Sequence, residues 1–489
     1  MSHPTKFPPG PPLSKILQLA RASVDPYANL EECQATYGDV FTLRVPGVLR
    51  AVMVADPAVV RTLVTSGYDA LSRKADNLRF LLGDHAVIFQ QGEEHKATRK
   101  MMAPPFHGDR MRAYGAAMAR VSDEMLARWQ DGQRRVLQRD FQEITLKVIL
   151  QAVFGDVDAQ RLEQLGRYFV EYVDGMLTPL FAGANLFVAG DRIRSLLRAL
   201  GGPVRRGERP PSDLPLQRVA DRLAAIERVL SEEIARCRRL SDAERAERVD
   251  LLSMLVAARY DDGSALSDEA LRDQIMILLI GGYETSATTL AWTIDCALRH
   301  PGTYERMRDE VASVMGDGFD PAKIKQLNYV GAVVSESMRL RPIAMAIPRE
   351  LRTEMTIGDY VFPAGTLVAP CVYLVQRDPR LWAEPTAFRP ERFLEKKPSV
   401  YEFFPFGAGV WRCLGAQFAE YEMRVILARL VARAELEAAA GVEVKPTQRG
   451  FTIAPSNGVP VRVRLRQPAR AATQTREGAA HDREASGSA

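Results

Sequence analysis

The sequence has few cysteines, and none of them form a close pair. Only five occur in 489 residues, at positions 33, 237, 296, 371 and 413. An odd number without a Cys-x-x-Cys motif argues against a disulfide framework and against a tetrahedral zinc site. We therefore expect a protein of the reducing cytoplasm, whose core is stabilised by apolar packing alone.

The sequence also lacks long apolar runs and an excess of charge of one sign. No stretch approaches the ~18 apolar residues that cross a bilayer, and the N-terminus has no apolar segment typical of a secretory signal. The formal net charge is +4, and acidic residues are interleaved with the basic ones. This pattern predicts neither a membrane span nor a nucleic-acid partner.

No linker and no internal repeat divides the chain, although its length would allow about three domains of ~150 residues. We expect one large domain over residues 16–467. A Pro-rich, extended segment precedes it at 1–15, and a tail at 468–489, rich in Ala, Arg, Glu, Ser and Gly, is expected to be disordered. We expect the protein to be a monomer.

Apolar residues recur at three- and four-residue spacing over most of the chain, which predicts helices. The longest such pattern, 267–299, begins at Ser267, a residue type that caps helices, and stops before Pro301. Shorter helical patterns cover 57–66, 93–263 (with breaks), 328–341 and 414–435. Strand patterns are confined to a hairpin at 37–57 and to 347–375 and 442–466. The fold class is therefore mainly α with a small β-rich lobe.

The surroundings of Cys413 distinguish it from the other cysteines. It lies between Gly409 and Gly415, directly before a predicted helix. Glycines allow the backbone to approach a flat cofactor closely, and the positive end of a helix favours a thiolate over a thiol. A lone cysteine is more often a small buried apolar side chain, and this is the alternative interpretation.

The segment FPFGAGVWRCLG (404–415) resembles the haem-binding loop of cytochromes P-450, Phe-x-x-Gly-x-(Arg/His)-x-Cys-x-Gly. The matching residues are Phe406, Gly409, Cys413 and Gly415. The resemblance implies haem b with its iron bound by the Cys413 thiolate, a ligand that promotes O–O cleavage. It also implies cofactor contacts from Phe406, Gly407, Trp411 and Gly415.

The sequence departs from this pattern at Trp411, where the family has Arg or His. An indole has one N–H donor and no charge. We therefore expect one haem propionate to be held less firmly, unless Arg412, His95, Arg99 or Arg349 compensates. In the alternative, the Trp411 ring packs so well that its apolar area outweighs the missing charge.

A second motif lies in the longest predicted helix, at ILLIGGYETSATT (277–289). A buried Glu284 would be costly without partners, and the Thr285 hydroxyl can bond the carbonyl of Gly281 and open the turn for water. Solvent-facing Glu284 and Thr285 are the simpler alternative. The segment resembles the family's oxygen-activation motif, which implies a catalytic role in proton delivery for Glu284 and Thr285.

Two further motifs are weak alone but occur in the family's order. ESMRLRP (336–342) and PERF (390–393) imply a structural network of Glu336, Arg339 and Arg392 that braces the haem loop. HKATR (95–99) puts His95 and Arg99 on one helix face, where they resemble residues that bind haem propionates. Arg349, after Pro348, resembles another propionate-binding arginine.

The resemblance, which runs from about residue 8 to 466, implies the fold of a cytochrome P-450. The implied enzyme inserts one oxygen atom of O2 into a hydrophobic substrate, by hydroxylation or epoxidation, and reduces the other to water. We expect separate redox partners, a ferredoxin or flavodoxin with its reductase, because no dinucleotide-binding strand–turn–helix unit is present. They would dock on the cysteine side of the haem, near Arg412, Lys96 and Lys100.

The substrate pocket implied by the family's pattern is almost entirely apolar, and its residues could equally be plain core. They are Leu78, Phe80, Leu81, Val87, Phe89, Ile277, Ile280, Gly281, Ile343, Ala344, Ile347 and Phe451. We expect a substrate such as a terpenoid, steroid, fatty acid or polyketide, and a role in secondary metabolism. The alternatives are a peroxide-driven haem-thiolate peroxygenase and a non-catalytic haem-binding sensor or carrier.

Overall fold

The computed structural model describes residues 7–466, apart from 45–49, 74, 76–77, 107–109, 156, 177, 179–187, 209, 211 and 317. The predicted tail at 468–489 lies outside the described residues, as does the link between the two strands of the predicted hairpin. Residues 7–14 of the Pro-rich segment are irregular. They lie along the first strand, where Thr42 donates its backbone N–H to the Pro9 carbonyl at 3.0 Å.

Helices make up most of the described chain, as the apolar spacing predicts. The α-helices are α1 (Lys15–Val24), α2 (Pro26–Tyr37), α3 (Pro57–Thr65), α4 (Arg79–Leu82), α5 (Gly92–Met102), α6 (Arg110–Leu126), α7 (Leu137–Phe154), α8 (Ala159–Met176), α10 (Gly190–Leu200), α11 (Gly202–Arg205), α12 (Pro215–Arg239), α13 (Asp242–Glu247), α14 (Leu251–Ala257), α15 (Asp268–Arg299), α16 (Thr303–Met315), α17 (Asn328–Leu340), α18 (Val372–Val375), α19 (Arg392–Glu395) and α20 (Ala416–Arg433). Short 3₁₀ turns are η2 (Val87–Phe89), η3 (Pro104–Phe106), η4 (Pro321–Gln326) and η5 (Gly409–Trp411).

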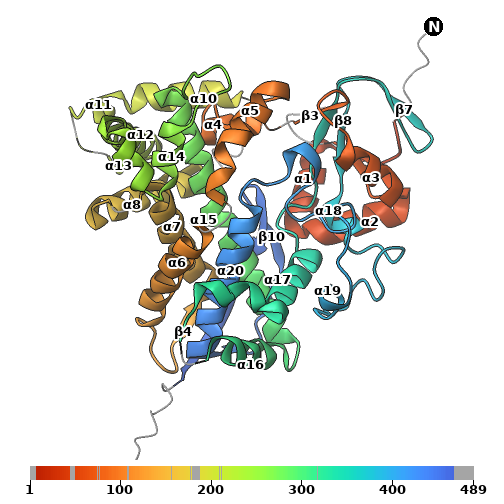
Figure 1. Ribbon diagram of the computed structural model, residues 1–489. Helices are drawn as coiled ribbons and strands as arrows, with labels where there is room; N and C mark the ends of the chain where they lie inside the picture. Colours follow the sequence, from red (N-terminus) through yellow and green to blue (C-terminus); the bar gives the residue numbers. More distant parts are fainter. Residues whose placement is uncertain are drawn as a thin grey trace, which may run out of the picture.

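The strands form small sheets beside the helices (Figure 1). They are β1 (Val40–Leu43), β2 (Ala51–Val54), β3 (Leu71–Arg73), β4 (Arg134–Val136), β5 (Arg349–Leu351), β6 (Met355–Ile357), β7 (Tyr360–Phe362), β8 (Leu367–Pro370), β9 (Ala434–Ala438), β10 (Pro446–Arg449), β11 (Thr452–Pro455) and β12 (Pro460–Leu465). The largest sheet has the order β1-β2-β8-β5-β3. The predicted hairpin is confirmed, with Val40 of β1 opposite Val54 of β2.

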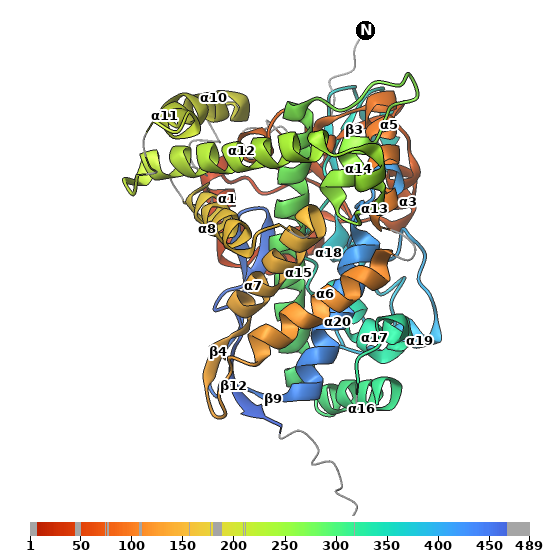
Figure 2. The ribbon, with the colours of Figure 1, turned by 60° about the vertical axis from the view of Figure 1, so that its left-hand side comes forward.

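The long helix α15 runs through the middle of the molecule and packs along α7 (Figure 2). It begins where the sequence predicts, because the Ser267 side chain accepts from the backbone N–H of Ala270 at 3.1 Å. Leu271, Ile275 and Leu290 are fully buried on it, so it forms the spine of the main apolar core. Most side chains of α15 therefore lie inside the molecule and not on its outer surface.

The boundaries of the last predicted helix are wrong at both ends. The sequence pattern indicates 414–435, whereas α20 spans Ala416–Arg433. Leu414 and Gly415 form a turn after Cys413, and Ala434 already pairs with Leu465 of β12. Strand pairing over this sequence distance overrides the local helical pattern.

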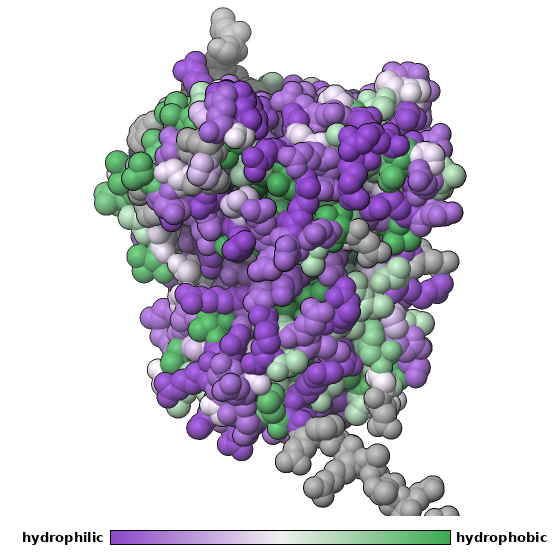
Figure 3. All heavy atoms as spheres, turned by 90° about the vertical axis from the view of Figure 1, so that its left-hand side faces the viewer, coloured by the Kyte–Doolittle hydropathy of each residue, from purple (hydrophilic) through white to green (hydrophobic). Residues whose placement is uncertain are grey.

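The outer surface fits the mixed charge of the sequence. Figure 3 shows one face of the molecule, which is hydrophilic over most of its area with small, separate hydrophobic patches. Among the described residues, no helix is both long and apolar enough to cross a membrane.

Candidate active site

The loop before α20 holds Cys413 in a defined position. The backbone N–H of Cys413 donates to the Phe406 carbonyl at 2.8 Å, which closes the loop around η5. Gly409 has a φ of 65°, and a Cβ there would lie 2.4 Å from the Val64 carbonyl oxygen. This position therefore requires glycine for both its backbone conformation and its close approach to the neighbouring chain.

Cys413 is the only one of the five cysteines that is exposed. Protein atoms nevertheless surround its thiol, and this burial raises the pKa. The residue is therefore accessible although protein atoms crowd around its sulfur. The backbone N–H of Gly415 and the guanidinium groups of Arg99, Arg412 and Arg73 oppose the rise in pKa and favour a thiolate.

A cluster of positive groups lies beside this loop. Arg73 of β3 and Arg349 of β5 are directly opposite each other across the two antiparallel strands. Like charges in this position repel. Arg99 and His95 of α5 belong to the same cluster, because each guanidinium lowers the pKa of the His95 imidazole. We call these four residues the cationic cluster.

The cationic cluster has no negative partner within the described part of the chain, since none of the ion pairs found there includes Arg73, Arg99 or Arg349. Burial and Arg99 lower the pKa of Arg73 to about 10, and burial and Arg73 lower that of Arg349 to about 9. Burial and the three arginines lower the pKa of His95 to about 4. The positive charges of the cationic cluster therefore repel one another. A bound anion with two negative charges would relieve this repulsion.

Trp411 contacts the cationic cluster and precedes Cys413 by two residues. Its ring is buried, makes an edge contact with Tyr68 at 5.3 Å between centroids, and stacks under the Arg349 guanidinium at 4.8 Å. Its carbonyl accepts from Arg73 at 2.8 Å, and its indole N–H has no partner among the described residues. The packing favours the second alternative for this residue, in which the apolar ring compensates for the missing charge.

One stripe of α15 is accessible although the helix runs through the interior. Ile277, Gly281 and Thr285 are spaced by four residues and are partly or fully exposed, whereas Leu279, Ile280 and Tyr283 are buried. A Cβ at Gly281 would meet nothing within 4 Å. The Thr285 hydroxyl donates to the Gly281 carbonyl, as the sequence predicts, and the helix continues through this turn.

Glu284 faces a different side of α15 from Thr285. Its carboxylate is buried, accepts from Gln142 Nε2 of α7 at 2.7 Å, and lies 3.6 Å from Arg449 Nε of β10. Burial raises its pKa, and Arg449 and Gln142 oppose this. The structure therefore separates the two members of the predicted proton-delivery pair, since adjacent residues on a helix point in different directions.

The network of Glu336, Arg339 and Arg392 forms as predicted. Glu336 accepts from Arg339 Nε at 2.7 Å and from Arg392 Nε at 3.1 Å, and all three side chains are buried. Arg339 also donates to the Gln376 carbonyl at 2.8 Å. The side-chain oxygen of Gln376 in turn accepts from the backbone N–H of Phe404, at 3.2 Å. The network thus reaches the start of the Cys413 loop through one residue.

The residues predicted for the substrate pocket divide into two groups. Phe80, Leu81 and Ile280 are buried in the main core. The others are partly or fully exposed, namely Leu78, Val87, Phe89, Ile277, Gly281, Ile343, Ala344, Ile347 and Phe451. Only this second group is accessible to a bound molecule without a rearrangement.

Sequence reasoning misses four residues at the site. Arg73 is a member of the cationic cluster, and the Tyr68 hydroxyl lies 2.5 Å from His95 Nδ1 of that cluster. Gln142 and Arg449 hold Glu284. Each comes from an element far away in the sequence. No local pattern marks them, because only strand register and helix packing bring them to the site.

The described residues fit a haem. An accessible thiol lies in a loop with glycines beside it, and the adjacent cationic cluster has the charge needed by two propionates. No cluster of His, Cys, Asp or Glu among the described residues could hold a metal ion by itself. A metal brought in by a flat macrocycle, with Cys413 as its protein ligand, is consistent with this.

Comparisons with known proteins agree with this geometry. The sequence matches the family model described as cytochrome P450 over residues 4–460. It is 32% identical over 477 residues to cytochrome P450 135B1 of Mycobacterium tuberculosis, covering 97% of this chain and 95% of that protein. It is 30% identical over 436 residues to cytochrome P450 137 of the same species, covering 88% and 83%.

The solved structure of retinoic acid bound cyanobacterial CYP120A1 has a similar fold. Its TM-score is 0.76 at 22% sequence identity, and the match covers 95% of this chain and 100% of that one. The chain thus belongs to the cytochrome P450 family, whose members are haem-dependent monooxygenases. This confirms the expected family, the mainly α fold class and the enzyme class.

Proposed function

We propose that the protein is a haem-thiolate monooxygenase in which Cys413 binds the iron of haem b. The observation that carries the proposal is the accessible thiol of Cys413 beside a cationic cluster without a carboxylate partner among the described residues. Phe406, Gly407 and Gly415 shape the loop against the macrocycle. Arg73, Arg99, Arg349 and His95 bind the two propionates, and the buried ring of Trp411 supports the Arg349 guanidinium from below.

The residues of α15 serve the opposite side of the site in this proposal. When bound, the haem activates O2 with two electrons from outside the chain. The absence of a side chain at Gly281 would leave room for bound O2, and the Thr285 hydroxyl would hold a proton donor beside it. Glu284 takes part in proton delivery from a different side of α15, where Arg449 and Gln142 oppose the effect of burial on the pKa of its carboxyl group.

The substrate is a hydrophobic molecule that contacts the accessible apolar residues of the predicted pocket. Val87, Ile277 and Phe451 are examples from three separate elements of the chain. We include a terpenoid, steroid, fatty acid or polyketide of secondary metabolism in the proposal. The stripe on α15 supports this, since it offers one hydroxyl and otherwise apolar or backbone surface.

Electrons come from a ferredoxin or flavodoxin with its reductase, which docks on the cysteine side. Of the three basic residues expected there, Lys96 lies 3.5 Å from Glu93 and Lys100 lies 2.9 Å from Asp261. Acidic neighbours reduce the attraction of both lysines for an acidic partner. Arg412 is exposed and takes part in none of the ion pairs of the described residues, so we assign it the main role.

The test is product formation from a panel of hydrophobic substrates with ¹⁸O2 and a ferredoxin–reductase pair. The proposal predicts one labelled oxygen atom per product and dependence on reduced nicotinamide. Product formed with hydrogen peroxide and no electron donor would indicate the peroxygenase alternative. Binding of haem and carbon monoxide without turnover of any substrate would indicate the sensor.

A further inference from the structure

The segment 78–89, which contains α4 and η2, is held by side chains from other elements. The Tyr172 hydroxyl of α8 donates to the Phe80 carbonyl at 3.0 Å. Gln274 of α15 is fully buried, accepts from the backbone N–H of Val87 at 3.0 Å, and donates to the His85 carbonyl at 2.6 Å. The conformation of this segment therefore depends on side chains of α8 and α15.

Asp273, the neighbour of Gln274 on α15, also holds the segment 78–89. Its carboxylate is buried and accepts from the backbone N–H of His85 at 3.0 Å. Gly83 adopts a φ of 92°, and a Cβ there would lie 2.0 Å from Asp273 Oδ1. The backbone of the segment 78–89 therefore packs directly against the buried carboxylate of Asp273.

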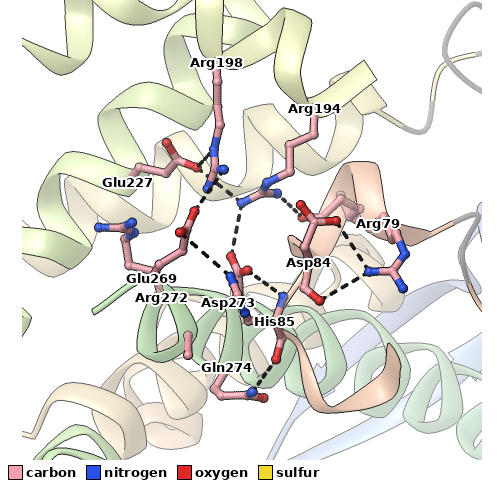
Figure 4. A network of polar contacts seen from close by, with 12 residues as sticks. Arg79, Asp84, His85, Arg194, Arg198, Glu227, Glu269, Arg272, Asp273 and Gln274 are labelled. Carbon is pink, nitrogen blue, oxygen red and sulfur yellow. Dashed lines mark hydrogen bonds and ion pairs between the residues drawn. The ribbon is translucent and has the colours of Figure 1, made fainter. Parts of the chain in front are cut away.

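Arg194 of α10 neutralises this charge (Figure 4). Its side chain is 2% exposed and lies 3.5 Å from Asp273 Oδ1 and 3.3 Å from Glu227 Oε1 of α12. The same guanidinium donates to the Leu81 carbonyl at 3.4 Å. One side chain therefore joins α10, α12, α15 and the segment 78–89.

A partly exposed outer layer extends the network. Arg198 lies 2.8 Å from Glu227 and 3.2 Å from Glu269, and Glu269 lies 3.8 Å from the His85 ring (Figure 4). A network of this kind strengthens every contact within it, and loss of one buried member leaves an uncompensated charge. Arg194 is the member whose loss would leave both Asp273 and Glu227 without their buried partner.

The segment 78–89 lies next to the proposed substrate site. It precedes α5, which carries His95 and Arg99 of the cationic cluster. On α15, Gln274 precedes Gly281 by seven residues, a rise of about 10 Å. Leu78, Val87 and Phe89 of the segment are accessible apolar residues of the predicted pocket.

We propose that Arg194 is a positioning residue that, through Asp273 and Glu227, fixes the segment 78–89 as a wall of the substrate site and limits how fast large ligands pass it. This inference rests on the proposed function, since the site is the one beside Cys413. Arg194 itself contacts no substrate in the proposal.

The first test is hydrogen–deuterium exchange of the haem-loaded protein with Arg194→Met. We expect amides of residues 78–89 to exchange at least about tenfold faster, which corresponds to about 1.4 kcal/mol of local stability. The control is Arg429→Met, since Arg429 of α20 forms a shorter and less buried ion pair with Asp123 of α6, at 2.8 Å, outside the Arg194 network. Equal exchange of 78–89 in the two variants would overturn the proposal.

The second test measures binding of two iron ligands of different size by stopped-flow absorbance. For 4-phenylimidazole, we expect Arg194→Met to raise the association rate and the dissociation rate by about tenfold each. The factor is the one expected for amide exchange, because both rates depend on how often the segment 78–89 opens. Cyanide, which needs little room, is expected to bind as in the wild-type protein. Unchanged 4-phenylimidazole rates with faster exchange would show a purely structural role and contradict the proposal.

Arg194→Lys decides the question if Arg194→Met does not fold. A lysine retains the charge but lacks the fork that reaches Asp273, Glu227 and Leu81 together, so we expect changes in the same direction and smaller. Wild-type rates in Arg194→Lys would then overturn the proposal. Failure of the proposed function would be distinguishable, because the wild-type protein itself would then lack a thiolate-type spectrum with carbon monoxide.

Discussion

The Thr285 hydroxyl is the polar side-chain group on the accessible stripe of α15. We expect Thr285→Ala to lower the product formed per reduced nicotinamide several-fold and to raise hydrogen peroxide release, because electron transfer does not need the hydroxyl and proton delivery does. Thr285→Ser retains the hydroxyl and is expected to keep most of the coupling. An unchanged ratio of product to nicotinamide in Thr285→Ala would remove this residue from the mechanism.

Arg73 is the member of the cationic cluster for which the sequence offers no motif. We expect Arg73→Met to accelerate haem loss to an apo-globin scavenger by about tenfold or more, since charge-assisted hydrogen bonds contribute about 1.5–3 kcal/mol. With haem dimethyl ester, which has no propionate charge, the substitution should have little effect. The exposed Arg134 of β4 provides the control, Arg134→Met. An equal acceleration with both forms of haem would show that Arg73 acts on the fold alone.

The packing of Trp411 changes the expectation that the missing charge at this position weakens haem retention. Trp411→Arg would add a fourth guanidinium to the cluster and remove the ring that packs against Tyr68 and Arg349. We therefore expect faster haem loss, whereas Trp411→Phe, which keeps a ring, should lie near the wild-type protein. Slower haem loss in Trp411→Arg would mean that the family's arginine is the better residue here as well.

The helices α20 and α15 pack against each other around a buried carboxyl group, that of Glu422. Glu422 of α20 is fully buried, and burial raises its pKa to about 8 against the opposing effect of Ser286 on α15. A raised pKa means that the protonated carboxyl stabilises the folded state. This contribution is present below a pH of about 4.5 and is lost as the pH rises to about 8.

We therefore expect Glu422→Gln to flatten the pH dependence of stability. The variant should lose less stability than the wild-type protein between pH 5 and pH 9, with a difference on the order of several kcal/mol at the upper end. Urea unfolding of both haem-loaded proteins across this range measures it. Parallel pH profiles would show that Glu422 finds a partner when it ionises.

Elements with a complete local pattern could be predicted, and those made by distant pairing could not. The hairpin β1–β2 follows from β-branched runs joined by a link that contains glycine, and the start of α15 follows from the cap at Ser267. The strand β4 interrupts the predicted helical region because it pairs with β12, more than 300 residues later. The opposition of Arg73 and Arg349 likewise depends on the register of β3 and β5, which no motif encodes.

In the molecule as a whole, the proposed function depends on one cysteine, Cys413. The other four are buried, so a haem iron could not reach their thiols without a rearrangement. Only Cys413 combines exposure with nearby positive groups. The fold, the cationic cluster and the Glu336 network all converge on its loop.

The most direct test is the absorption spectrum of the reduced protein with carbon monoxide, for the wild type, Cys413→Ser and the control Cys33→Ser. We expect a thiolate-type spectrum for the wild type and for Cys33→Ser. In Cys413→Ser, both this spectrum and the monooxygenase activity should be lost. A thiolate-type spectrum that persists in Cys413→Ser would mean that another cysteine binds the iron, and it would contradict the assignment of the site.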